Sequence, residues 1–293
     1  MTTRLERELT SSKPAQEVRE KADSGSGWYE WLARFGLVAK GISYVILGVL
    51  AIGVAVDKGG KTTSRSGALA ELAKHPLGKV LLIVLAIGFA SYALWRIVQA
   101  FAERAEDPDA EGQAKKWGTR AGYLGRAAIY AGLAYVSVKI LVGSHVQESQ
   151  NEQARQRTAE ALSWPAGRWI VAAAGLVIIG VGLWNLYRGV ARKFEDKWRG
   201  GMGQTAKKYG AWIGVVGHIA RAVVFVLIGI FITKAAIEYD PKEAIGLDGA
   251  LQKLAAESYG SWLLGLTAAG LIAYGVYCLF DAWYRDVSAN RSS

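Results

Sequence analysis

The chain has little of what disulfide frameworks and metal centres require. Cys278 is its one cysteine, inside an apolar stretch, and it has only 3 histidines in 293 residues. A single cysteine excludes an intrachain disulfide and a CxxC-type zinc site. Because His75, His145 and His218 share no ligand spacing, the sequence predicts no metal or haem site and no cofactor.

Catalytic signatures are missing as well. The sequence contains no phosphate-binding glycine loop, no dinucleotide fingerprint and no Ser/His/Asp or Cys/His arrangement. We therefore expect a protein without enzymatic activity. Residues 1–27 are polar and of mixed charge and lack an apolar core, so we do not interpret them as a secretory signal.

Apolar sequence is abundant. Hydrophobic residues make up 52% of the chain, and it has 35 glycines and 11 tryptophans, a composition typical of a membrane protein with several spans. Six apolar runs are long enough to cross a bilayer as helices. They cover roughly residues 35–56, 78–101, 121–143, 168–190, 211–235 and 261–284.

One motif opens every odd-numbered run. At fixed spacing it has a tryptophan, a glycine, a lysine or arginine, a small residue directly after that cation, and an aromatic residue. Its copies are Trp31–Gly36–Lys40–Gly41–Tyr44, Trp117–Gly122–Arg126–Ala127–Tyr130 and Trp212–Gly217–Arg221–Ala222–Phe225. A charge inside a membrane span is costly, so cations at matching positions indicate a shared role.

The even-numbered runs repeat too. Residues 67–101 align without a gap on residues 249–283, with 12 identities in 35 positions, among them Tyr92 with Tyr274. The middle copy is looser, but a proline, a glycine and a tryptophan still match: Pro76 with Pro165, Gly78 with Gly167, and Trp95 with Trp184. Each unit therefore contains two spans and returns the chain to its starting side. Such units must be parallel, which excludes inverted repeats.

These repeats predict an all-α integral membrane protein. Its six transmembrane helices form three parallel two-helix repeats with pseudo-threefold symmetry about the membrane normal. The units cover residues 28–103, 114–194 and 209–286, between a polar, disordered tail at 1–27 and a short tail at 287–293. Amphipathic connectors at 67–76, 158–165 and 249–258 predict short helices at the membrane interface.

The distribution of basic residues predicts the orientation. The chain has 35 basic and 25 acidic residues, and the basic ones concentrate on the side that holds both termini, above all in the 188–210 connection. This pattern places both termini in the cytoplasm. Topology explains the excess charge better than nucleic-acid binding does. The expected partners are membrane lipids, anionic ones included.

Three sequences carry a family resemblance: GLVAKGISY (36–44), GYLGRAAIY (122–130) and GHIARAVVF (217–225). With the two-helix repeat, they resemble the bacterial membrane family catalogued as domain of unknown function 1206. The resemblance covers residues 28–285. It implies a six-helix bacterial inner-membrane protein and brings no activity with it.

The motif cations are the main candidates for a site. Residues four apart lie on nearly one helix face, so Gly36, Lys40 and Tyr44 form one stripe. Three interpretations stay open for the cations. In the first they snorkel as structural residues, in the second they hold a phosphate or lipid headgroup, and in the third they line a transport path. The candidate anion- or lipid-binding residues are Lys40, Arg126, Arg221, Tyr44 and Tyr130, with Asp281 as an ion-pair partner.

Two functions follow from these interpretations. The first is a non-enzymatic membrane protein that organises, binds lipid or anion, or binds a protein partner. The alternative is a small-solute or anion transporter or channel, with Lys40, Arg126 and Arg221 lining the path. A polar groove across the whole bundle would favour transport, whereas an apolar, sealed outer half would favour binding.

Overall fold

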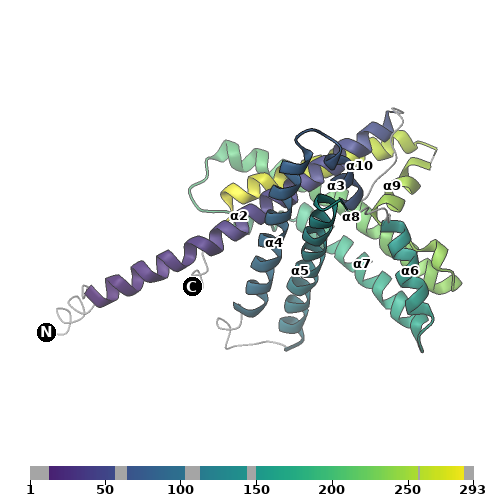
Figure 1. The fold of residues 1–293 in the computed structure, drawn as a ribbon, viewed down its shortest axis with the longest axis horizontal. Helices are drawn as coiled ribbons and strands as arrows, with labels where there is room; N and C mark the ends of the chain where they lie inside the picture. The colour runs from purple at the N-terminus through teal and green to yellow at the C-terminus, as the bar shows by residue number, and fades with distance from the viewer. Residues whose placement is uncertain (1–12, 57–64, 103–112, 144–149, 257, 287–293) are drawn as a thin grey trace.

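The computed structural model describes residues 13–56, 65–102, 113–143, 150–256 and 258–286, and the described chain is helical (Figure 1). Six long helices are apolar enough to cross a membrane, which confirms the predicted spans. They are α2 (Lys13–Ala55), α4 (Gly78–Ala102), α5 (Gln113–Leu141), α7 (Gly167–Val190), α8 (Gln204–Glu238) and α10 (Gly260–Tyr284).

Helix α2 differs from the prediction at its start. It has 43 residues and begins at Lys13, so residues 13–27 are helical, although they were expected to belong to a disordered tail. At 1.5 Å per residue this helix is about 65 Å long, roughly twice the hydrocarbon thickness of a bilayer. The helix therefore extends well beyond its apolar part. Residues 1–12 and 287–293, the rest of the expected tails, lie outside the described residues.

Short helices connect the spans within each unit. They are α3 (Arg65–Ala73), α6 (Gln150–Leu162) and α9 (Leu247–Ala256), the last preceded by the 3-10 helix η2 (Pro241–Glu243). We call the side on which they lie the connector face. Asn151 of α6 binds the start of α9: its backbone N–H donates to Asp248 Oδ1 at 3.0 Å, and its side-chain oxygen accepts from Gly246 N at 2.7 Å. These bonds join the connectors of the second and third units.

The opposite side is called the termini face. It contains residues 28–34 of α2, the 191–203 connection with the 3-10 helix η1 (Glu195–Lys197), and the end of α10. Between the two faces the long helices pack in the order α5–α4–α2–α10–α8–α7. Within the described residues no packed interface joins α5 to α7, although these are the two spans of the second unit. Figure 1 shows α4 beside α5, and α7 running along α8 away from α5.

The motif glycines explain how helices pack within the first and third units. A Cβ added at Gly36 of α2 would lie 2.5 Å from Tyr92 Cβ of α4, and one at Gly217 of α8 would lie 2.5 Å from Tyr274 Cα of α10. Only glycine allows such an approach, because real Cβ contacts are longer. The two sites are equivalent in the repeat, so one packing rule is used twice.

The small residue after the cation packs between units. A Cβ added at Gly41 of α2 would lie 2.8 Å from the carbonyl oxygen of Gly275 in α10. The equivalent pair between the second and third units is Gly182 with the carbonyl oxygen of Ala222, at 3.2 Å from the added Cβ. Two residues that are five positions apart in a helix point in directions that differ by about 140°. The glycine and the small residue of one motif therefore face different neighbours.

Candidate functional site

Arg221 of α8 contacts two tyrosines from different units. Its Nη1 donates a hydrogen bond of 2.5 Å to the Tyr274 hydroxyl, and its guanidinium lies 4.4 Å from the centre of the Tyr274 ring. The same guanidinium is 5.6 Å from the Tyr44 ring, which meets Tyr274 edge-on at 4.8 Å. The motif cation of the third unit thus joins the motif aromatic residue of the first through a tyrosine of α10.

Lys40 lies between the two repeated tyrosines. Its Nζ is 5.1 Å from the ring centre of Tyr274 and 5.6 Å from that of Tyr92. The Tyr92 ring in turn contacts Tyr130, with centroids 4.4 Å apart. Both Tyr44 and Tyr130 are buried, at 2% and 5% exposure. Tyr130 of the second unit thus packs against Tyr92 of the first, as Tyr44 of the first unit packs against Tyr274 of the third.

Two arginines meet at the ring of Tyr123. The Arg96 guanidinium is 5.5 Å and the Arg126 guanidinium 5.7 Å from its centre. Arg96 is buried and donates to the Tyr92 hydroxyl at 2.6 Å and to Gln99 Oε1 at 2.6 Å. Arg126 is exposed on α5. Two like charges thus share one aromatic ring.

These residues form one arrangement, which we call the cation–tyrosine centre. It consists of Lys40, Arg96, Arg126, Arg221, Tyr44, Tyr92, Tyr123, Tyr130 and Tyr274. The structure brings Lys40, Arg221 and Tyr44 together around Tyr274. Arg126 and Tyr130 lie on the other side, around Tyr123 and Tyr92 respectively.

Within the described ranges, no carboxylate balances this charge. Among the described residues, none of the ion pairs includes Lys40, Arg96, Arg126 or Arg221. The Nε atoms of Arg96 and Arg221 are buried and have no hydrogen-bond partner in the described part of the chain. The centre therefore has positive charge and donors without matching acceptors.

Asp281 does not pair with the motif cations. It lies on α10 near the termini face and pairs with Arg285, one helical turn on, whose Nε donates to Asp281 Oδ2 at 2.9 Å. Their side chains are 1% and 9% exposed. The second carboxylate oxygen, Oδ1, is buried without a partner in the described chain. This acid therefore neutralises a cation of its own helix.

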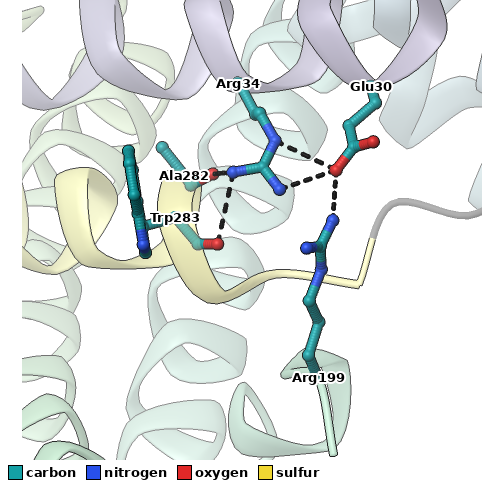
Figure 2. Close-up of polar contacts among 5 residues, drawn as sticks. All are labelled: Glu30, Arg34, Arg199, Ala282 and Trp283. Carbon is teal, nitrogen blue, oxygen red and sulfur yellow. Dashed lines mark hydrogen bonds and ion pairs between the residues drawn. The ribbon is translucent and has the colours of Figure 1, made fainter. Parts of the chain in front are cut away.

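Figure 2 shows a polar cluster on the termini face. Arg34 of α2 donates from Nη1 to the carbonyl oxygens of Ala282 and Trp283, at 3.0 and 3.2 Å. Its Nη2 donates to Glu30 Oε1 at 2.6 Å, and that oxygen also accepts from Arg199. Arg34 thus caps the last turn of α10, since these carbonyls have no partner within the helix. The cluster links the first unit, the third unit and the basic connection.

The 191–203 connection binds α10 through its backbone. Arg199 N donates to the Tyr284 carbonyl, and Asp286 N to the Lys197 carbonyl, both at 2.9 Å. The pKa of Lys197 is lowered to about 8, mainly because burial desolvates the ammonium group and secondly because Arg285 is positively charged. The basic connection is therefore a fixed part of the termini face.

His218 has a structural environment. Its ring stacks on Phe194 at 5.0 Å, and its Nδ1 lies 2.7 Å from the Gly214 carbonyl oxygen. The described residues include no group of three or more His, Cys, Asp or Glu side chains that could hold a metal ion.

Sequence reasoning missed the role of several residues in this region. Tyr92 and Tyr274 were noticed only as identities of the internal alignment, yet they contact the motif cations. Their identity in two units was the signal that could have found them. Tyr123 and Arg285 gave no such signal. One has no tyrosine at its equivalent positions, and the other lies just beyond the aligned segment.

The fold and the centre together define a polytopic α-helical membrane protein built from three two-helix units. The chain belongs to the family described as Domain of Unknown Function (DUF1206), whose model matches residues 35–103, 121–192 and 216–285, one match per unit. It is 30% identical over 268 residues to the Uncharacterized protein YxxB of Bacillus subtilis (strain 168), an alignment that covers 89% of this chain and 93% of that protein. No solved structure matches. With its six spans and its bacterial relative, the chain is a membrane protein of bacterial type.

Proposed function

We propose that this protein is a non-enzymatic inner-membrane protein that binds a phosphate-bearing anion at the cation–tyrosine centre, with both termini in the cytoplasm. The observation that carries the proposal is the convergence of Lys40, Arg96, Arg126 and Arg221 on shared tyrosine rings without a carboxylate among the described residues.

The energetic argument concerns uncompensated charge. Removing a cation from water costs several kcal/mol, and a cation–π contact returns only about 0.5–2 kcal/mol. The ring faces also leave N–H donors unused. Arg221 makes one hydrogen bond to Tyr274, and its Nε has no partner among the described residues. A phosphate offers several acceptor oxygens and negative charge at once, and arginine matches it in a bidentate manner.

The apolar character of the half of the bundle nearer the connector face supports a binding function over a transport function. Its buried side chains are mostly apolar, and include Leu47, Leu85, Phe89, Leu264 and Leu271. Among the buried residues described for the spans in this half, Ser43, Ser137 and Thr267 have a polar side chain that is not aromatic. Ser43 donates to the Lys40 carbonyl oxygen and Ser137 to the Leu133 carbonyl oxygen, each within its own helix at 2.8 Å. A transport path would need polar groups continuing to this face.

Neutralising the centre should reduce anion binding. In the double variant Lys40→Gln, Arg221→Gln we expect the affinity for dihexanoyl phosphatidylglycerol to fall at least about tenfold, because charge-assisted hydrogen bonds to phosphate are lost. Native mass spectrometry of the full chain in mild detergent measures the occupancy. Lys139→Gln, a cation of the connector-side half, is the matched control. Equal occupancy in all three proteins would refute the proposal.

The orientation has its own test. In a Cys278→Ser background, single cysteines at Ser64 and at Gly200 should react differently with an impermeant thiol reagent on intact cells. We expect labelling at position 64 only, because the basic 191–203 connection should remain in the cytoplasm. Cys278 is buried, so its replacement removes background without altering the surface. Labelling at position 200 but not at position 64 would show that the orientation is opposite to the proposed one.

A further inference from the structure

The second unit lacks the helix contact that the other two units make. In the first unit Gly36 and Ala39 of α2 meet Tyr92 and Gly88 of α4, and in the third the same positions of α8 and α10 meet. The repeat places Gly122 and Gly125 of α5 opposite Val181 and Val177 of α7. Yet among the residues that the structure describes, a Cβ added at Gly125 would have no neighbour within 4 Å, and no packed interface joins the two helices.

The faces involved are therefore open. Val177 and Val181 are 66% and 41% exposed, whereas the equivalent Tyr92 and Tyr274 are 1% and 2% exposed. Val181 also changes the chemistry of the centre, because it replaces the third repeated tyrosine. Tyr92 and Tyr274 each contact the Lys40 ammonium, but the valine at the equivalent position 181 supplies neither an aromatic ring nor a hydroxyl.

A cation lies on this open face. The Nη2 atom of Arg126 is 4.0 Å from the position of a Cβ at Gly122, so the guanidinium folds along the surface that would otherwise pack on α7. No hydrogen bond or ion pair of Arg126 occurs among the described residues. Its neighbour at the Tyr123 ring, Arg96, is only 7% exposed and has a buried Nε without a partner in the described chain. Both donors need an acceptor.

We propose that one anionic phospholipid occupies the open faces of α5 and α7. Its phosphate binds Arg126 at the break in the cation–tyrosine centre, where Val181 stands in place of a tyrosine. Its acyl chains lie against Gly125, Ile129 and Val177. This inference rests on the proposed anion binding and specifies the ligand and its route: a lipid that enters sideways from the bilayer.

The positive charge of Arg126 and of the whole chain favours an anionic lipid, not a second copy of the chain, as the occupant of these faces. A symmetric dimer through these faces would bring two Arg126 guanidiniums toward each other, in a chain with a formal net charge of +10. An anionic phospholipid provides the missing acceptor and the apolar surface in one molecule. Exposed apolar residues flank the cation on α5, namely Leu124 at 43% and Ile129 at 57% exposure. Such a face is suited to acyl chains.

The test uses dioleoyl phosphatidylglycerol that carries a photoreactive group in one acyl chain. Cross-linking to the full-length protein in nanodiscs, followed by peptide mass spectrometry, should place most adducts on α5 and α7, between residues 122–132 and 174–184. Adducts spread evenly over all six spans would overturn the lateral site. Loss of cross-linking together with dimer formation would show that a second copy covers these faces.

Two variants test the break itself. Val181→Tyr restores the third tyrosine, whose ring covers the open face and whose hydroxyl adds an acceptor there, and should lower dioleoyl phosphatidylglycerol occupancy at least about tenfold. Arg126→Gln should lower it similarly. The control Leu183→Tyr adds the same ring at a position that is 54% exposed on another face of α7, and should leave occupancy unchanged. Unchanged occupancy in Val181→Tyr would overturn the inference.

The outcomes separate the two proposals. If Lys40→Gln, Arg221→Gln weakens binding of the short-chain lipid but Val181→Tyr has no effect on the long-chain lipid, the centre binds anions and the lateral site is wrong. If neither lipid responds to any of these variants, anion binding at the centre fails, and the lateral site fails with it. Circular dichroism and the unfolding temperature verify that each variant is folded.

Discussion

Gly36→Ala and Gly217→Ala are each expected to destabilise the protein by about 1–3 kcal/mol, because an added methyl group overpacks a helix contact. The new Cβ would lie 2.5 Å from Tyr92 in the first variant and 2.5 Å from Tyr274 in the second, and the atoms it meets include backbone. A backbone cannot rotate away as a flexible side chain does. The helices must therefore separate, which also moves the tyrosines that contact Lys40.

The second unit supplies the control for this prediction. A Cβ at Gly122 meets only Arg126 Nη2, at 4.0 Å. Gly122→Ala should therefore leave stability unchanged or raise it by up to about 1 kcal/mol, because alanine favours a helix. Thermal unfolding in mild detergent, followed by tryptophan fluorescence, compares the three variants. Equal destabilisation at all three positions would contradict the open face on α5.

The fold could be predicted from the sequence because its elements are long and its motif recurs. Six apolar runs predicted the six spans. Gly36 and Gly41 are five residues apart and therefore lie on different faces of their helix, and in the structure each contacts a different neighbouring helix. The stripe of Gly36, Lys40 and Tyr44 was recognised from helical periodicity. Local patterns of this kind depend only on the geometry of one helix, so the sequence reveals them directly.

The break between α5 and α7 could not be predicted in the same way. The repeat suggests that every unit is equivalent, and the differences at Gly125, Val177 and Val181 look like ordinary variation within apolar helices. Whether such residues pack or face lipid depends on the tertiary arrangement, because lipid and a protein interior are equally apolar. The same reasoning applies to the cations: their spacing was visible, but the tyrosine rings around Lys40 and Arg221 come from the first and the third unit together, which only the tertiary arrangement determines.

The ion-pair partner of Asp281 could not be predicted from the sequence either. As the deepest acid of the last span it was expected to pair with a cation near the centre. Arg285 follows it by one turn, at the helix end, where a basic side chain is usually solvated. Instead, both groups are buried beneath the termini face, and the Arg285 guanidinium lies 5.8 Å from the Trp95 ring. The Trp95 ring and the 191–203 connection, which bonds the backbone of residues 284 and 286, thus enclose a pair that would otherwise lie at the surface.

Asp281→Asn should therefore destabilise the protein by about 3–5 kcal/mol, because it leaves the Arg285 charge buried without a counter-charge. The ion pair is formed within one helix turn, and its two side chains are almost inaccessible to water. The midpoint of thermal unfolding in mild detergent measures the loss. Glu71→Gln is the control, since its pair with Lys74 is exposed and such pairs contribute about 0–1 kcal/mol.

A double variant distinguishes loss of charge balance from loss of shape. Asp281→Leu with Arg285→Met removes both charges and keeps apolar volume, and should recover most of the stability that Asp281→Asn loses, because replacing a buried pair by apolar residues is often neutral or stabilising. If the double variant is as unstable as Asp281→Asn, the carboxylate has another essential partner, and the buried pair with Arg285 is not its main role. If the Asp281→Asn variant has the same unfolding temperature as the wild type, the charge of Arg285 is solvated, and the ion pair contributes as little stability as an exposed one.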